Sequence, residues 1–210
     1  VVFPGGWNNW YNRISCIVKK RYGGYEKVKR GWRSVVFIYK EFVLKVFFRE
    51  RDFRRERDVL KNLQNLPFVP RIYGIDEEML GIRMERICGK ELRRYFLEAK
   101  NKEIRVGLKL CLLIAIILDI LGYENPEMNR PLKHIIFTKG FPKLIDYERF
   151  RKKENPGNLP KILSFFFFSG GRIKERVREI YGNFCEERMM EFLREYKKSF
   201  LEIRRKILDP

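Results

Sequence analysis

The chain has 210 residues, enough for one two-lobed unit or two very small domains, and its 45% apolar content supports a buried core. Its 46 Lys and Arg residues outnumber its 27 Asp and Glu residues, which gives a formal net charge of +19. This excess favours anionic partners, either a nucleotide or a nucleic acid bound through a basic surface. Runs of charged residues are ordinarily explained by helix faces in contact with water.

Four scattered cysteines and a single histidine argue against a zinc site. The apolar segment at residues 108–121 is too short to span a bilayer and contains Asp119, so we expect a central buried helix and no membrane contact. No signal peptide is expected, which predicts a cytoplasmic protein. Lys, Arg, Glu and Ile are abundant and Gln64 is the only glutamine, a usage typical of thermophiles.

Two strands are predicted in the first quarter of the chain. Residues 29–37 contain a glycine turn at Gly31 and then Ser34 before an apolar run, a pattern that a plain hairpin turn also gives. Residues 42–48 are apolar except for Lys45. A buried ammonium group without a partner is costly, so Lys45 needs a carboxylate or a phosphate.

The next segment offers that carboxylate. Residues 52–66 predict a helix, and Glu56 lies on its apolar stripe, three residues after Phe53 and four before Leu60. We expect Glu56 to pair with Lys45. The alternative is a glutamate at the edge of the stripe that reaches water or pairs with a neighbouring arginine.

Three polar residues follow the central helix at short spacing. Glu127 lies in a loop, His134 enters a short apolar strand, and Asp146 leaves the next apolar run. Such a layout suits phosphoryl transfer, because one carboxylate can face the attacking hydroxyl while the other holds Mg²⁺ against nucleotide phosphates.

The last third of the chain predicts an irregular loop and two helices. Residues 152–161 contain two prolines and a glycine and predict the loop, and residues 162–168 predict a buried segment. The helices are predicted at residues 173–181 and 185–207, the second with a packing or partner-binding face. Its apolar side chains at helical spacing are Phe192, Tyr196, Phe200 and Ile203.

Taken in order, the glycine turn, lysine strand, glutamate helix, strand and turn at residues 82–92, apolar helix and acidic loops resemble a protein kinase over about residues 23–150. The resemblance is to the small atypical archaeal Ser/Thr protein kinase-like family, related to the RIO-type kinases. It implies an α+β, minimal two-lobed kinase-like fold. Residues 1–88 would form a small lobe, an antiparallel sheet plus one helix, and residues 89–210 a larger, mainly helical lobe.

The resemblance also implies roles for individual residues. Lys45 would hold the nucleotide phosphates and Glu56 would orient it. Backbone groups along residues 82–92 would meet the adenine edge, although an ordinary strand, turn and helix has the same pattern. Glu127 would position the hydroxyl nucleophile and Asp146 would bind Mg²⁺. The implied nucleotide-binding residues are Gly31, Ser34, Lys45, Glu56, Glu85 and Ile87.

The chain departs from the kinase pattern in its catalytic loop. Glu127 replaces the usual aspartate, and no histidine lies two residues before it. His134 stands where kinases place an asparagine metal ligand, and imidazole suits Mg²⁺ poorly. His134 could instead form a hydrogen bond to a phosphate, act as a ligand for Mn²⁺ or support the loop. Lys133 lies near the transferred phosphate in this scheme, or is simply a solvated lysine.

The function that the sequence predicts is therefore ATP- and Mg²⁺-dependent transfer of a phosphoryl group to a Ser or Thr of an unidentified protein. One alternative is a nucleotide-binding pseudokinase or RNA-associated scaffold, favoured by the altered catalytic loop and the positive charge. A small-molecule kinase is a third, because the segment after Asp146 is short.

Overall fold

A computed structural model describes residues 6–183 and 185–208 of the protein, with the side chains of residues 201 and 203–208 outside the description. The chain divides into two compact units, Val1–Ile87 and Cys88–Pro210, one residue before the expected boundary. Across the described residues there are seven α-helices and a five-stranded antiparallel sheet, which confirms the predicted α+β class.

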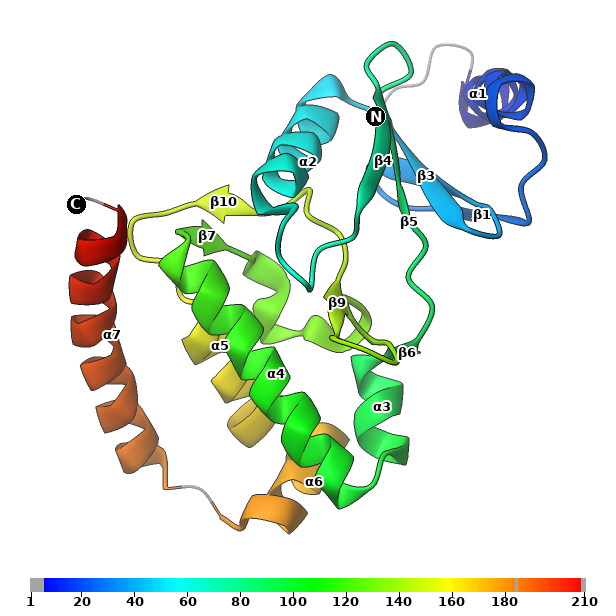
Figure 1. The fold of residues 1–210 in the computed structure, drawn as a ribbon. Coiled ribbons are helices and arrows are strands. Elements are labelled where there is room, and N and C mark those ends of the chain that lie inside the picture. The colour runs from blue at the N-terminus through cyan, green and yellow to red at the C-terminus, as the bar shows by residue number, and fades with distance from the viewer. Residues whose placement is uncertain (1–5, 184, 209–210) are drawn as a thin grey trace. The chain divides into compact units, whose positions relative to one another are not determined.

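The first unit is a single antiparallel sheet with a helix on each face (Figure 1). The strand order is β1-β2-β3-β5-β4. Its elements are α1 (Gly6–Tyr22), β1 (Lys27–Arg30), β2 (Ser34–Ile38), β3 (Phe42–Phe47), α2 (Glu50–Leu63), β4 (Ile72–Asp76) and β5 (Gly81–Glu85).

Strand β3 is central, because it is bonded to β2 on one side and to β5 on the other. Successive side chains of a strand point to opposite faces of the sheet. Leu44 and Val46 join the buried cluster that also contains Val18 of α1. Lys45 and Phe47 point to the other face, where they meet side chains of α2. Burial on both faces explains why the strand is apolar at nearly every position.

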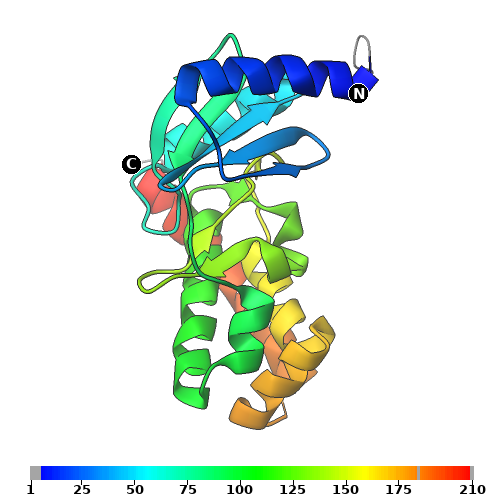
Figure 2. The same cartoon turned by 90° about the vertical axis from the view of Figure 1, so that its right-hand side faces the viewer.

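Helix α1 was not predicted, and the expectation of one helix beside the sheet is wrong. Figure 2 shows α1 lying across the sheet. Its first turns carry Trp7 and Trp10, whose rings stack at 5.5 Å between centroids and meet Phe48 edge-on. Gly23 ends the helix at a φ of +79°, and its N–H donates to the carbonyl oxygen of Lys19 at 3.0 Å. A glycine in this conformation is a usual helix C-terminus.

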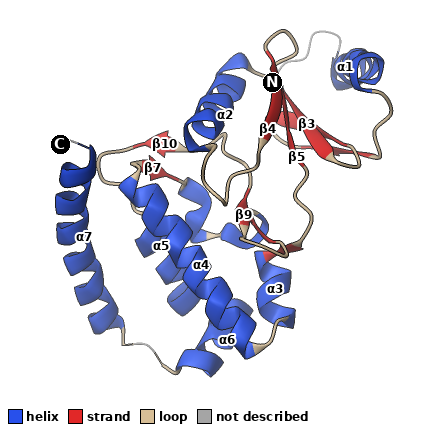
Figure 3. Ribbon diagram, in the orientation of Figure 1, coloured by secondary structure: helices blue, strands red, loops and turns tan. Residues whose placement is uncertain are grey.

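The second unit is mainly helical, with short strands between its helices (Figure 3). Its helical elements are α3 (Leu92–Glu98), α4 (Asn101–Ile120), two 3₁₀ turns η1 (Pro126–Asn129) and η2 (Pro131–Lys133), α5 (Asn158–Ser164), the π-helical turn η3 (Phe165–Ser169), α6 (Arg172–Tyr181) and α7 (Glu186–Leu208). Its strands are β6 (Lys90–Glu91), β7 (Tyr123–Glu124), β8 (Ile135–Phe137), β9 (Lys143–Leu144) and β10 (Arg151–Lys152). They pair as a β6-β8-β9 sheet and a β10-β7 ladder.

The core of this unit surrounds α4, whose Cys111, Ile114 and Leu118 are fully buried. No helix in the described part of the chain is long and apolar enough to cross a membrane. The irregular loop predicted at residues 152–161 is shorter in the structure, where α5 begins at Asn158. In α7, Phe200 is buried, whereas Ile203 lies outside the described side chains.

Candidate functional site

The expected ion pair is present in the first unit. The Nζ of Lys45 donates to Glu56 at 2.7 Å from Oε2 and 3.1 Å from Oε1. Lys45 is 5% exposed and Glu56 is 1% exposed, so this glutamate does not lie at a water-exposed edge of α2. The pairing register of β3 and the apolar stripe of α2 together place the two side chains against each other.

Aromatic rings lie beside this pair. The Lys45 ammonium lies 5.2 Å from the ring centre of Phe47, which in turn packs edge-on against Phe53 at 6.0 Å. A charge removed from water in this way depends on its partner, because desolvation costs several kcal/mol per ion. The geometry holds the lysine ammonium at a defined position on the sheet.

The glycine turn at Gly31 connects β1 and β2 as a hairpin, which is the alternative given in the sequence analysis. The N–H of Gly31 donates to the carbonyl oxygen of Ser34 at 2.8 Å. Ser34 is buried and begins β2 opposite Phe47. Its side chain presents little surface to a ligand, so phosphate contact at this turn would fall to backbone groups.

The predicted adenine-binding segment, residues 82–92, covers most of β5 and the turn that follows it. The N–H of Glu85 donates to the carbonyl oxygen of Arg71 at 2.8 Å, and a Glu85 carboxylate oxygen accepts from the N–H of Arg71 at 3.1 Å. Ile87 follows the strand and is half-buried. In the second unit, a side chain at Gly89 would collide with the carbonyl oxygen of Phe137, which explains the glycine there.

The second unit brings together the three polar residues that follow the central helix. Strands β8 and β9 pair with Ile135 opposite Leu144, and the N–H of Ile145 donates to the carbonyl oxygen of His134 at 2.8 Å. This pairing places His134, which precedes β8, beside Asp146, which follows Ile145. The Nδ1 of His134 lies 3.5 Å from Oδ2 of Asp146.

Glu127 completes the cluster from the opposite side of the imidazole. Its Oε2 lies 3.1 Å from Nε2 of His134, and its Oε1 accepts from the guanidinium of Arg149 at 2.8 Å. Both ring nitrogens of His134 therefore face carboxylates. The side chains of Glu127 and His134 are 23% and 24% exposed, and that of Asp146 is 44% exposed. Lys133 is exposed beside this group.

A chain of buried hydrogen bonds fixes the backbone of the Glu127 loop. Asp119, near the end of α4, accepts from the backbone and side-chain N–H groups of Asn158 at 2.8 and 2.7 Å. The side-chain oxygen of Asn158 accepts from the N–H of Asn125 at 2.8 Å. The side-chain oxygen of Asn125 then accepts from the N–H of Glu127 at 2.9 Å. The loop is thus tied to α4 and to the start of α5.

Asp119 is the buried anchor of this network. Burial raises the pKa of its carboxyl, and this effect outweighs the hydrogen bonds from Asn158 and Leu159 that lower the pKa.

 The second carboxylate oxygen of Asp119 accepts hydrogen bonds from the N–H of Leu159 at 3.0 Å and from the hydroxyl of Tyr196 in α7 at 3.1 Å. One carboxylate therefore joins α4, α5 and α7.

Asp146 has an unusual backbone conformation. Its φ is +65°, in the left-handed region where aspartate and asparagine are better tolerated than most other residues. The residues that follow are firmly packed, since Tyr147 and Phe150 are buried with ring centres 4.6 Å apart. The packed turn holds the Asp146 carboxylate at the surface and places Arg149 beside Glu127.

The cluster offers one good ligand for Mg²⁺. Among the residues that the structure describes, no group of three or more His, Cys, Asp or Glu side chains could hold a metal ion. The half-exposed carboxylate of Asp146 supplies the oxygen that Mg²⁺ prefers, and water and phosphate oxygens usually complete its shell. His134 fits this role poorly, because both of its nitrogens already face carboxylates.

The sequence did not predict the roles of Arg149, Asn158 or Asp119 in this site. Arg149 is 22 residues from Glu127, and only the packed turn after Asp146 brings the two together. The one available signal for Asp119 was an acidic residue in an apolar helix. No protein-family model matches the chain, and no curated protein sequence matches it. A function is therefore inferred from the geometry of these residues.

Proposed function

We propose that the protein is a minimal, atypical kinase that transfers the γ-phosphoryl group of ATP to a Ser or Thr hydroxyl of another protein. The observation that carries this proposal is the buried Lys45–Glu56 ion pair between the central strand and its helix. A lysine held in this way can bind nucleotide phosphates. The glutamate fixes the position of the ammonium group, which can still bind a further anion.

Glu127 is the residue that would orient the attacking hydroxyl and accept its proton. Arg149 and His134 hold the two oxygens of its carboxylate, and the Asn125 side chain holds its backbone. Orientation and proton acceptance by such a group contribute roughly 10²- to 10⁴-fold to a rate. Arg149 and His134 are positioning residues in this proposal.

Asp146 is the residue that would hold Mg²⁺. The ion, when bound, would offset the charge that develops on the phosphate oxygens. The exposure of the Asp146 carboxylate and its oxygen chemistry support this role. A cytoplasmic location and a protein acceptor, both expected from the sequence, belong to the proposal as well.

The direct test is incubation with γ-labelled ATP and Mg²⁺ or Mn²⁺, with a panel of protein and small-molecule acceptors. We expect label transfer by the unchanged protein and none by Lys45→Met or Asp146→Asn variants that fold normally. A folded protein that binds ATP and transfers no label to any acceptor would contradict the proposal.

Two observations favour a nucleotide-binding pseudokinase or RNA-associated scaffold as the second candidate. Both oxygens of the Glu127 carboxylate face protein groups, Arg149 and His134, rather than an open position for a substrate hydroxyl, and the chain carries a net charge of +19. RNA binding whose affinity falls steeply with salt, without phosphate transfer, would favour this function.

A further inference from the structure

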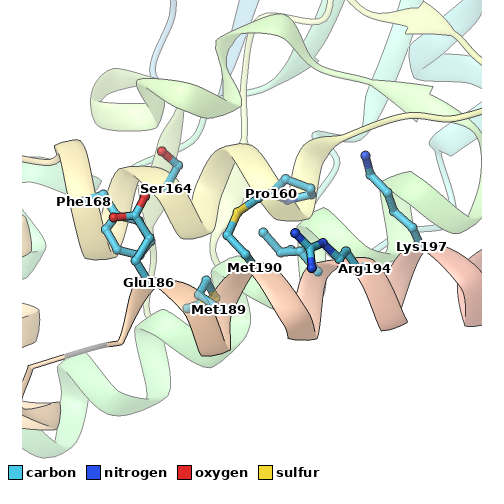
Figure 4. Close-up of a pocket in the computed structure, with 9 residues that line it drawn as sticks. Pro160, Ser164, Phe168, Glu186, Met189, Met190, Arg194 and Lys197 are labelled. Atoms are coloured by element: carbon cyan, nitrogen blue, oxygen red, sulfur yellow. The ribbon is translucent and has the colours of Figure 1, made fainter.

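A groove lies between the first three turns of α7 and the segment formed by α5 and η3. Its volume is about 350 Å³, within the range of small-molecule sites in proteins. Figure 4 shows Met189 and Met190 between Pro160 and Phe168 in the middle of the groove. Methionine side chains are flexible and adapt to apolar ligands of varied shape.

The two ends of the groove carry opposite charge. In Figure 4, Arg194 and Lys197 lie beyond Met190 at one end, while Glu186 lies beside Phe168 and Ser164 at the other. Within the described part of the chain, neither Arg194 nor Lys197 has an ion-pair or hydrogen-bond partner. Two cations without a carboxylate partner, at the mouth of an apolar groove, complement an anionic head group.

We propose that this groove binds an amphipathic monoanion, a straight alkyl chain with one carboxylate head. The chain would lie along the two methionines, where it removes apolar surface from water. The head group would lie between Arg194 and Lys197, which stand three residues apart on one face of α7. This inference is independent of the proposed phosphoryl transfer.

The position of Glu186 makes the groove selective. A ligand with a second carboxylate at the far end of its chain would bring like charges together, which opposes binding. A chain without a head group would lose the contact with the two cations. The groove should therefore prefer decanoate both to decanedioate and to decanol.

Methyl NMR of the full chain, labelled with carbon-13 at the methionine methyl groups, tests this proposal. The chain has five methionines, so Met79, Met84 and Met128 serve as internal references for the two in the groove. Decanoate, added below its micelle-forming concentration, should shift the signals of Met189 and Met190 in a saturable way and leave the other three unchanged. Equal shifts of all five, or none, would overturn the proposal.

Affinities from the same titrations test the head group and the selectivity. We expect decanoate to bind roughly tenfold more tightly than decanol or decanedioate. A doubly substituted Arg194→Gln, Lys197→Gln protein should lose the preference over decanol, whereas Lys198→Gln, a nearby lysine outside the groove, should keep it. Glu186→Gln should bring decanedioate closer to decanoate.

A variant in the middle of the groove guards against binding elsewhere on the basic surface. Met190 is half-exposed, so Met190→Glu should leave the fold intact and weaken decanoate binding at least tenfold by placing a negative charge beside the chain. Unchanged decanoate affinity in this variant would overturn the proposal. So would shifts of Met189 and Met190 that depend on protein concentration rather than on decanoate, since the occupant would then be a second copy of the chain.

Discussion

The Lys45–Glu56 pair and the Glu127–His134–Asp146 cluster differ in their exposure to water. Lys45 and Glu56 form a buried ion pair. Glu127, His134 and Asp146 form a partly exposed group, in which the surface residue Arg149 pairs with Glu127. From this contrast we expect a substitution in the first group to change stability and nucleotide binding together, and one in the second group to change the transfer rate with little effect on folding.

The largest expected effect is that of Lys45→Ala. Removing the lysine leaves the Glu56 carboxylate buried without its partner, which should lower the free energy of unfolding by about 3–5 kcal/mol and abolish ATP binding. Urea denaturation and nucleotide titration measure the two effects. Arg54→Ala, which removes a solvent-exposed pair with Glu50 in the same helix, is the matched control and should cost far less.

A double substitution separates the two effects. Lys45→Met with Glu56→Leu removes both charges and should recover most of the lost stability, because apolar residues of similar size often replace a buried pair without loss. ATP binding should remain absent. If ATP binds normally to either folded variant, the phosphate-holding role of Lys45 is wrong.

The next effect is that of Glu127→Gln on catalysis. We expect a fall in the transfer rate of roughly 10²- to 10⁴-fold with nearly unchanged ATP affinity and stability. Glu127→Asp should keep part of the activity, because the carboxylate is shorter by one methylene. Single-turnover kinetics measure the rate, and equal activity of the unchanged and Glu127→Gln proteins would reject the role.

Asp146→Asn should selectively weaken the metal-dependent part of nucleotide binding, since it removes a formal charge from the ligand shell of the cation. Asparagine also tolerates the left-handed backbone at this position, so the comparison is free of added strain. Titration with ATP, with and without Mg²⁺, measures the difference. Identical Mg²⁺ dependence before and after substitution would exclude Asp146 as the metal-binding residue.

A smaller effect is expected from His134→Asn. If His134 positions Glu127, the turnover rate should fall roughly tenfold, while the KM for ATP stays near its original value. A preference that moves from Mn²⁺ toward Mg²⁺ would instead assign His134 to the metal. Measurement of kcat and KM with each cation decides between the two roles.

The smallest expected effect is that of Tyr196→Phe. The substitution removes one hydrogen bond to the buried Asp119 carboxylate, which should lower the free energy of unfolding by about 1–2 kcal/mol. Thermal and urea unfolding measure the change. A loss of catalytic rate at unchanged stability would show that α7 acts on the Glu127 loop rather than on folding alone.

The parts of the fold that the sequence predicted well have strong local patterns. Lys45 interrupts an apolar strand and Glu56 lies on an apolar helical stripe, so the two could be paired from sequence. The bounds of α2 were less well predicted. The observed helix runs from Glu50 to Leu63 rather than from 52 to 66, and it ends before the Leu66-Pro67 pair, where proline disfavours helix in the preceding residue.

The missed parts depend on contacts between distant segments. Helix α1 is rich in Trp, Tyr and Asn, residues of low helical propensity, and packing against the sheet stabilises it. The first four residues of α5 fall in the predicted loop because Pro160 suggested irregular structure, but proline is tolerated within the first turn of a helix. The positions of Arg149 and Asn158 beside the Glu127 loop follow from tertiary packing rather than from any local pattern.

The bonds from Asn158 and Leu159 to Asp119 have a consequence for hydrogen exchange. The first amide protons of a helix normally exchange early with solvent, because they have no acceptor within the helix. In α5 two of these protons bond to the carboxylate of another helix, which the hydroxyl of Tyr196 also contacts. Their exchange requires that the Asp119 junction opens, so the start of α5 should be protected as long as α4 and α7 remain folded around it.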